Sequence, residues 1–310
     1  MRCTVAWQER GSRAAIRLIG SIPRAVAYPL CALAGELYFW LNPGHSAKAV
    51  QNFAVVLADD VRSPRVRLMA RRSFRNYVKS LYDFFRQMSI DPDLIEADVF
   101  IEGSGHLDAA LALGKGVLLV TPHFGNWDLA GALTAARGYP MAALVDQFPS
   151  PFADRLVRYG RNRMGMGVVT LDSGSLRRTL QLLRRNVVIG ILADRPQCEG
   201  GVEVDFFGAP AWFPTGTARF ALRTGAPLLL GYVGRRPGDR TFFGAYVPLP
   251  LPPLTGDERA DIQAITQNVV RVMENLLRQY PDQWYMFRQM WPSTDAVREG
   301  SDGERSGIGR

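Results

Sequence analysis

The chain has 310 residues, of which 47% are hydrophobic and 21% charged, and its mean hydropathy is −0.05. This balance is typical of one globular domain with additions, and it excludes a disordered chain and a protein with many membrane spans. The formal net charge is +8, and only three of the 37 basic residues are lysines, which leaves 34 arginines. Arginine binds phosphate in a bidentate fork, which suits anionic lipid headgroups, although a GC-rich genome explains the same bias. No nucleic-acid recognition motif accompanies these residues, so we expect no nucleic-acid partner.

The N-terminal region is strongly apolar. Residues 14–41 contain only three charged residues and two prolines. Their longest uncharged run, residues 25–35, has 11 residues, whereas a helix that spans a bilayer needs roughly 20. We therefore expect residues 1–45 to form a membrane-associating helical segment that lies on or dips into the bilayer, with the aromatic residues 38–40 at the interface. A buried N-terminal helix that packs on the core explains the same pattern.

The next segment, residues 61–88, has a helical apolar stripe interrupted by arginines. Beyond it, short β-branched runs alternate with amphipathic segments. The predicted strands cover residues 116–121, 141–145, 167–171, 186–194, 227–233 and 241–247. The predicted helices lie near residues 126–137, 151–164, 174–184, 215–224 and 258–280. This alternation predicts an α/β domain over residues 46–292, with a central, mostly parallel sheet flanked by helices. Residues 293–310 are polar and rich in glycine, and we expect a flexible tail.

One segment, VTPHFGNWDLAG (residues 120–131), carries the clearest chemical signal. A buried β run ends before Pro122, which places His123 in the turn from a strand to a helix. Gly125 gives that turn conformational freedom, and Asn126 can cap the helix that follows. Because α/β sheets place their sites at the C-terminal ends of strands, His123 is the candidate catalytic residue.

Asp128 follows His123 by five residues. In one continuous helix the two side chains would be separated by about 140° around the axis, so they can meet only if His123 precedes the helix. Asp128 would then accept the proton of one imidazole nitrogen and raise the basicity of the other. That nitrogen could deprotonate a hydroxyl attacking an acyl thioester, while backbone amides around Gly125 stabilise the oxyanion. An ordinary turn with an incidental histidine explains the spacing too, since a His-x4-Asp pattern often arises by chance.

The same segment resembles a known motif. TPHFGNWD is similar to the His-x4-Asp/Glu motif of the lysophospholipid acyltransferase superfamily. The longer run over residues 102–131 is closer to the branch of lipid A biosynthesis late acyltransferases and phosphatidylinositol mannoside acyltransferases. The blocks at residues 191–227 and 281–291 resemble the FFG and Gln-Trp blocks of that branch. The lipid A enzymes usually have Glu where this chain has Asp128, so the resemblance leaves the acceptor open.

The resemblance also implies roles for particular residues. It makes His123 the catalytic base, Asp128 its acidic partner, and Asp194 a further acidic residue near the reacting centre. Substrate contacts are expected at Gly125, Asn126, Asp146, Arg161, Arg195, Phe206, Phe207 and Thr215. A strand that ends in a turn explains Phe206 and Phe207 equally, and a simple helix cap explains Thr215. The aromatic residues of the last block, Trp284 among them, are expected to pack in the core.

The function implied by the resemblance is transfer of a fatty acyl chain to a hydroxyl of a membrane glycolipid. Acyl-CoA or acyl carrier protein would supply the chain, without a metal, another cofactor or a covalent acyl-enzyme. Membrane lipids and the glycolipid acceptor would be its partners, at the cytoplasmic face of the inner membrane. Two alternatives are an acyltransferase of the lysophosphatidic acid type and a non-catalytic peripheral protein that binds lipid. The motifs of serine hydrolases, P-loop NTPases and zinc proteases are absent from the sequence.

Overall fold

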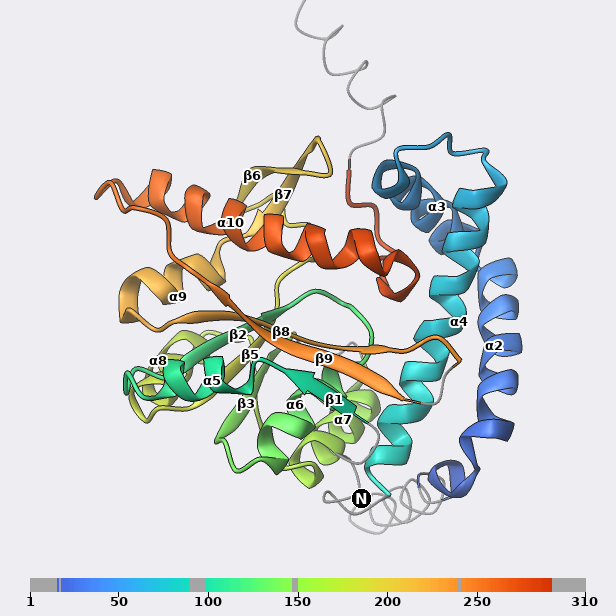
Figure 1. Ribbon diagram of the computed structural model, residues 1–310, viewed down its shortest axis with the longest axis horizontal. Helices are drawn as coiled ribbons and strands as arrows, with labels where there is room; N and C mark the ends of the chain where they lie inside the picture. Colours follow the sequence, from blue (N-terminus) through green and yellow to red (C-terminus); the bar gives the residue numbers. More distant parts are fainter. Residues whose placement is uncertain (1–15, 17, 90–98, 147–149, 239–240, 292–310) are drawn as a thin grey trace, which may run out of the picture.

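The computed structural model describes residues 16, 18–89, 99–146, 150–238 and 241–291. A seven-stranded sheet runs through its centre in the order β1-β9-β8-β2-β5-β3-β4 (Figure 1). Its strands are β1 (Val99–Glu102), β2 (Val117–Thr121), β3 (Met141–Val145), β4 (Met166–Thr170), β5 (Val188–Leu192), β8 (Leu228–Arg235) and β9 (Phe242–Leu249). Only the β8–β9 pair is antiparallel. The predicted α/β fold with a mostly parallel central sheet is therefore confirmed.

The central strand β2 is buried along its whole length. Leu118 and Val120 belong to a core shared with α9 (Gly216–Thr224) and α10 (Glu258–Gln279), which lies across one face of the sheet (Figure 1). Val117 and Leu119 belong to a second core, shared with the helices of the opposite face. Those helices include α5 (Ser104–Leu111) and α6 (Trp127–Ala136). A strand covered on both faces needs apolar side chains at every position, which explains the uninterrupted run VLLVT.

Two further helices, α7 (Pro151–Arg163) and α8 (Ser175–Arg184), separate β3, β4 and β5 along the chain. Three strands were not predicted. One is β1 at the sheet edge, and the others form an antiparallel hairpin of β6 (Gly201–Phe206) and β7 (Ala209–Pro214). The hairpin lies above α10 rather than in the main sheet (Figure 1). The short strand β1 has only four residues, too few to show a clear alternation.

Three helices cover one end of the sheet: α2 (Arg24–Leu41), α3 (Pro43–Leu57) and α4 (Pro64–Gln87) (Figure 1). The backbones of α2 and α4 approach closely at Gly35, where a Cβ atom would lie 2.5 Å from the Cα of Arg75. Glu36 beside it pairs with Arg71 at 2.9 Å and also with Arg75. In the described part of the chain, no helix is both long and apolar enough to cross a bilayer.

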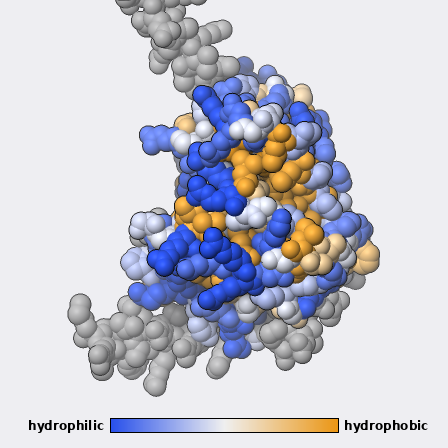
Figure 2. All heavy atoms as spheres, turned by 90° about the vertical axis from the view of Figure 1, so that its left-hand side faces the viewer, coloured by the Kyte–Doolittle hydropathy of each residue, from blue (hydrophilic) through white to orange (hydrophobic). Residues whose placement is uncertain are grey.

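The outer face of α2 exposes a row of large apolar side chains. Exposed fractions are 54% for Val26, 58% for Leu30 and Leu33, 51% for Leu37 and 55% for Trp40. The inner face of α2 is buried against the rest of the protein through residues such as Tyr28. Figure 2 shows the side of the molecule opposite α2, where hydrophilic side chains cover much of the surface and apolar ones form a band across the middle. Helix α2 is thus packed against the protein on one face and exposes apolar side chains to solvent on the other. Its association with a membrane stays a prediction. The predicted tail at 293–310 lies outside the described residues.

Candidate active site

His123 and Asp194 lie at the ends of two adjacent parallel strands. Thr121 of β2 is paired with Leu192 of β5. His123 lies two residues after Thr121, and Asp194 lies two residues after Leu192. The His123 ring nitrogen Nδ1 lies 2.5 Å from Asp194 Oδ1. The backbone N–H of His123 donates to the other carboxylate oxygen at 2.8 Å. One carboxylate therefore fixes both the backbone and the ring of the histidine.

The Asp194 carboxylate is fully buried and also accepts a hydrogen bond from Trp284 Nε1 at 2.9 Å. Burial alone would raise the pKa of Asp194, but the charge of His123 and the hydrogen bonds from His123 and Trp284 hold this pKa below its usual value. An ionised carboxylate can only accept hydrogen bonds, so Nδ1 of His123 carries the proton that lies between them. In the neutral ring, Nε2 then holds the free lone pair.

Asp128 has a different partner from the predicted one. Its Oδ1 lies 2.7 Å from Nε of Arg161 on α7. The expectation that Asp128 accepts the imidazole proton is therefore corrected: the carboxylate bonded to the ring belongs to Asp194. The reason is local, because Asp128 sits in the first turn of α6, whereas Asp194 leaves the neighbouring strand at the level of His123.

The turn between β2 and α6 is clamped by its backbone. Gly125 donates its N–H to the carbonyl of Gln283, and Asn126 donates to the carbonyl of Val233, both at 2.8 Å. Gly125 has a φ of 56°, and a Cβ atom there would collide with the Val233 carbonyl. The predicted need for glycine is confirmed, and so is the cap, since Asn126 Oδ1 accepts from Leu129 N at 2.9 Å. The Gly125 and Asn126 amides are already bonded within the protein, so these two are not free to act as the predicted oxyanion donors. A role for the other amides at the start of α6 stays a prediction.

Two cavities meet at His123, whose side chain is 11% exposed. The first has a volume of about 450 Å³ and the second about 390 Å³. Both are lined by His123, Trp127, Asp128, Arg161, Leu192, Arg195 and Arg288. The first continues between the sheet and α6, where its walls include Leu119, Ala130, Gly131, Met141, Ala143, Met166 and Gly190. The second extends toward α4 and the C-terminal segment, along residues such as Tyr77, Phe84, Tyr285 and Phe287. The imidazole thus stands where a mainly apolar cavity and a second open cavity join.

Five of the predicted substrate-binding residues line the two cavities, namely Gly125, Asn126, Asp146, Arg161 and Arg195. Arg161 is buried, and its Nη1 atom has no hydrogen-bond partner within the described part of the chain. Arg195 pairs with Asp146 at 2.5 Å near the mouth of the first cavity. The structure brings these residues together around His123, and their contact with substrate stays a prediction.

The other predicted contacts lie elsewhere. Phe206 is 1% exposed and stacks on Trp291 with ring centroids 5.4 Å apart, while Phe207 occupies the hairpin turn with a φ of 58°. Thr215 donates to the carbonyl of Gly200 and accepts from Arg219. The described residues that line the two cavities do not include these three. Aromatic packing therefore accounts for Phe206 and Phe207. Thr215 stands at the start of α9, but its hydroxyl bonds to Gly200 and Arg219 and makes no cap hydrogen bond.

Several residues of the site were not predicted. Trp284, expected only as a core aromatic, donates the hydrogen bond that secures Asp194. Trp127 packs against the His123 ring with ring centroids 5.4 Å apart. Tyr285 donates its backbone N–H to the carbonyl of His123 at 2.8 Å. The signal for Trp284 and Tyr285 was the Gln-Trp-Tyr run near the C-terminus, whose closeness to His123 no local pattern reveals.

Comparison with known proteins extends this description. A family model described as bacterial lipid A biosynthesis acyltransferase matches residues 2–293. The chain belongs to this family. It is 32% identical to a phosphatidylinositol mannoside acyltransferase of Mycobacterium tuberculosis, over 71% of this chain and 69% of the relative. The corresponding protein of Mycolicibacterium smegmatis is 28% identical over 96% and 94% of the two chains.

A lipid A biosynthesis acyltransferase of Haemophilus influenzae is 30% identical over 34% of this chain and 33% of the relative. The predicted resemblance to this branch is thereby confirmed, and the protein is an acyltransferase of this family.

The lowered pKa of Asp194 leads to a prediction about stability. Its ionised form stabilises the folded state fully above the unfolded-state pKa of about 3.9. As the pH falls through that value, the unfolded chain binds the proton first, so stability decreases until the pH passes the folded-state pKa. We expect Asp194→Asn to lack this part of the acid loss in urea unfolding measured between about pH 6 and pH 3. Asp146→Asn, which changes an exposed carboxylate, is the control. Equal slopes in the wild type and Asp194→Asn would contradict the assigned ionised pair.

Proposed function

We propose that this protein transfers a fatty acyl chain from an acyl thioester to a hydroxyl of a phosphatidylinositol mannoside type of glycolipid. The observation that carries the proposal is the hydrogen bond between His123 and the buried Asp194 at the junction of two cavities. The acceptor class is supported by the relatives, since those named for phosphatidylinositol mannoside match far more of the chain than the one named for lipid A.

In the proposed reaction, His123 acts as a general base. Its Nδ1–H continues to donate a hydrogen bond to Asp194, and its Nε2 removes the proton of the acceptor hydroxyl. The hydroxyl oxygen attacks the thioester carbonyl carbon, a new C–O bond forms and the C–S bond breaks. The leaving thiolate takes the proton back from the imidazolium, which restores the enzyme. The charge of Asp194 favours the imidazolium in the transition state, and the reaction uses no metal, no other cofactor and no covalent acyl-enzyme.

Arg161 is the proposed donor for the oxygen that becomes negative. Its Nη1 is buried beside both cavities and, among the described residues, has no hydrogen-bond partner. Asp128 holds the guanidinium through Nε, so the group is oriented before substrate arrives. A donor placed in advance in a site with little water stabilises developing charge well. This role replaces the backbone amides of the turn and gives Asp128 a supporting part.

The cavity under α6 is the proposed acyl site, because its inner walls are apolar and the glycines that line it lie close to methionine side chains. Gly131 and Gly190 face two methionines: a Cβ on Gly131 would collide with Met166, and one on Gly190 would lie 2.7 Å from the Met141 methyl group. The second cavity is then left for the acceptor headgroup. Acyl-CoA and acyl carrier protein both present the chain as a thioester, and either donor fits this division.

The catalytic assignment is tested with purified protein, palmitoyl-CoA and phosphatidylinositol mannosides, with the products measured by mass spectrometry. We expect His123→Ala to lower transfer by about a thousandfold, within the range usual for a lost general base, while its thermal unfolding stays cooperative. His106→Ala is the matched control, because His106 lies on α5 and bonds to the Tyr246 carbonyl. Wild-type rates in His123→Ala would refute the mechanism. If the wild type transferred no chain to the mannosides but acylated a lipid A precursor, the acceptor proposal would be wrong.

The acyl site leads to a prediction about chain length. We expect Gly131→Leu to fill the inner part of the first cavity, so that the rate with palmitoyl-CoA falls at least about tenfold relative to decanoyl-CoA, because overpacking excludes the longer chain. Ala136→Leu adds the same side chain at an exposed position of the same helix and should leave the ratio unchanged. The ratio of kcat/KM for the two donors is the measurement. An unchanged ratio in Gly131→Leu would place the acyl chain elsewhere.

The outer face of α2 is the proposed contact with the membrane, at the cytoplasmic face of the inner membrane where the acceptor lies. Its apolar row would enter the boundary of the bilayer, and arginines such as Arg67, which stacks on Trp40 at 4.7 Å, would meet anionic headgroups. No helix of the described residues spans a bilayer, and a helix that lies in the interface needs no span.

We expect Leu30→Ser combined with Leu33→Ser to weaken binding to anionic phospholipid vesicles at least about tenfold. Two exposed leucine side chains that enter the bilayer on binding contribute more than about 1.4 kcal/mol. Co-sedimentation measures the effect. The control combines Leu113→Ser with Leu254→Ser, two leucines that are 61% and 54% exposed but lie on other parts of the surface. Equal vesicle binding by both double variants would exclude α2 as the membrane contact.

A further inference from the structure

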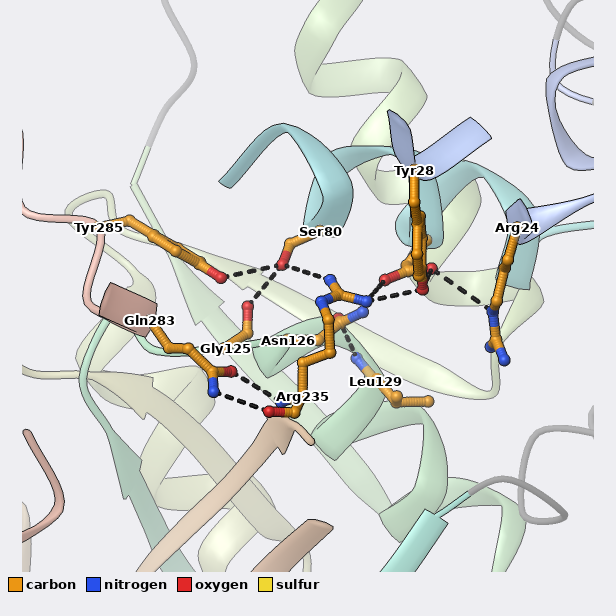
Figure 3. Close-up of polar contacts among 10 residues, drawn as sticks. Arg24, Tyr28, Ser80, Gly125, Asn126, Leu129, Arg235, Gln283 and Tyr285 are labelled. Carbon is orange, nitrogen blue, oxygen red and sulfur yellow. Dashed lines mark hydrogen bonds and ion pairs between the residues drawn. The ribbon is translucent and has the colours of Figure 1, made fainter. Parts of the chain in front are cut away.

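Behind the catalytic turn lies a buried charged cluster of Arg235, Asp83 and Tyr28. Arg235 ends β8, and its Nη1 lies 2.9 Å from Asp83 Oδ2 on α4 and 2.6 Å from the Tyr28 hydroxyl on α2. The Tyr28 hydroxyl in turn donates to Asp83 Oδ1 at 2.8 Å. The side chains of Arg235 and Asp83 are 5% and 1% exposed. Figure 3 shows that the guanidinium of Arg235 lies between Tyr28 on one side and Ser80 on the other. The cluster therefore joins α2, α4 and the central sheet at one point.

Stability alone does not account for such a cluster. Burial by itself would lower the pKa of Arg235, but the charge of Asp83 raises it above the ordinary arginine value, so the guanidinium stays charged. A buried ion pair loses its hydration, and replacing it with apolar residues of similar size is often neutral or stabilising. What a satisfied buried pair provides is a fixed geometry among the elements it joins.

The backbone of Arg235 is tied directly to the turn through Gln283. The Gln283 side chain accepts from the Arg235 N–H at 2.7 Å and donates to the Arg235 carbonyl at 2.9 Å (Figure 3). The carbonyl of Gln283 accepts the N–H of Gly125. Two residues before Arg235 on the same strand, Val233 accepts the N–H of Asn126. If this end of β8 moved, both acceptors that hold the amides of Gly125 and Asn126 would move with it, and the turn would be displaced.

The guanidinium reaches the same turn through Ser80. Arg235 Nη2 donates to the Ser80 hydroxyl at 3.5 Å, and this hydroxyl donates to the Gly125 carbonyl at 2.8 Å (Figure 3). The Tyr285 hydroxyl lies 3.2 Å from the same oxygen, and the Tyr285 backbone N–H is bonded to the carbonyl of His123. Both the carbonyl and the N–H of Gly125 are thus held by groups that contact Arg235.

We propose that Tyr28, Asp83 and Arg235 are positioning residues, which hold the turn that carries His123 in place relative to Asp194 and to helix α2. Their effect on rate rests on the proposed acyltransferase mechanism, because a displacement of about 1 Å at a reacting group can lower the rate on the order of a hundredfold. The same cluster connects the turn to the helix whose outer face carries the exposed apolar row.

The first test compares two tyrosines between the same helices. Tyr28→Phe removes the hydroxyl that bonds Arg235 and Asp83, whereas Tyr82→Phe removes one that donates to the Ile22 carbonyl at 2.5 Å. We expect Tyr28→Phe to lower kcat about tenfold with KM for the acyl donor unchanged, and Tyr82→Phe to leave both constants near the wild type. Equal kcat values in the two variants would overturn the proposal.

A double variant separates positioning from stability. Asp83→Leu combined with Arg235→Met removes both charges of the buried pair. We expect a melting temperature near that of the wild type, because Arg24, which also pairs with Asp83 at 3.9 Å, is 23% exposed and can be hydrated. The kcat of the double variant should still fall at least as far as in Tyr28→Phe. The single variant Arg235→Lys, which retains the charge, should have a kcat between that of the double variant and that of the wild type. A double variant that melts like the wild type and also turns over like it would overturn the proposal.

An NMR measurement of the imidazole ring tests the positioning without any substrate. The signal of the His123 Nδ1 proton is assigned by its loss in His123→Ala, and it reports the hydrogen bond to Asp194. We expect this signal to shift in Tyr28→Phe and in the double variant but not in Tyr82→Phe. An unmoved signal in every variant would overturn the positioning role. Shifted signals in a protein that transfers no acyl chain would support the positioning role and reject the proposed function.

Discussion

The hydrogen bond between the His123 ring and the Asp194 carboxylate is the interaction on which the rest of the site depends. A carboxylate with no solvent exposure is costly to ionise, and this cost is offset by three donors: the ring, the His123 backbone N–H and the Trp284 indole. Each donor comes from a segment that must be in place before the carboxylate can be buried. The charge therefore stabilises one arrangement of β2, β5 and the C-terminal segment, and it sets the tautomer of the histidine in that arrangement.

The backbone of the turn after β2 is fixed by hydrogen bonds to several elements. It has to place an imidazole at the junction of two cavities, and a loose turn would lose the alignment with Asp194. Its backbone groups are bonded to β8, to α4 and to the segment around Gln283, and glycine is required where the Val233 carbonyl approaches. The same bonds that fix the histidine occupy the amide of Gly125. In the proposed mechanism the oxyanion is therefore bound by the buried guanidinium of Arg161.

The surroundings of the site fit the chemistry of the family. An apolar cavity lies under α6 and a second cavity opens toward α4. In the proposed function, the donor chain and the acceptor headgroup approach the imidazole from these two directions. Helix α2 packs on α4 with its inner face and exposes leucines and a tryptophan on its outer face. In the proposed function, α2 contacts the lipid surface, and the Arg235 cluster connects α2 to the turn that carries His123.

Much of this protein was determined by local sequence. The periodicity of apolar residues predicted six of the seven sheet strands, helix α4 and the helices α6 to α10, and Pro122, Gly125 and Asn126 predicted the turn that holds His123. Such features depend on neighbours a few residues away, and the steric and hydrogen-bonding rules are the same in every chain. The resemblance of three separated blocks added the family and the presence of Asp194 near the centre.

Only the tertiary structure decided which groups meet. His123 and Asp194 are 71 residues apart in the chain, and they touch because β5 pairs with β2 in a register that no local pattern contains. Asp128, closer in sequence, turns to Arg161, and Phe206 and Phe207 pack with the hairpin rather than in a cavity. Spacing along the chain measures distance only within one element. Across strands and helices, distance is set by pairing and packing, which exist only after the chain has folded.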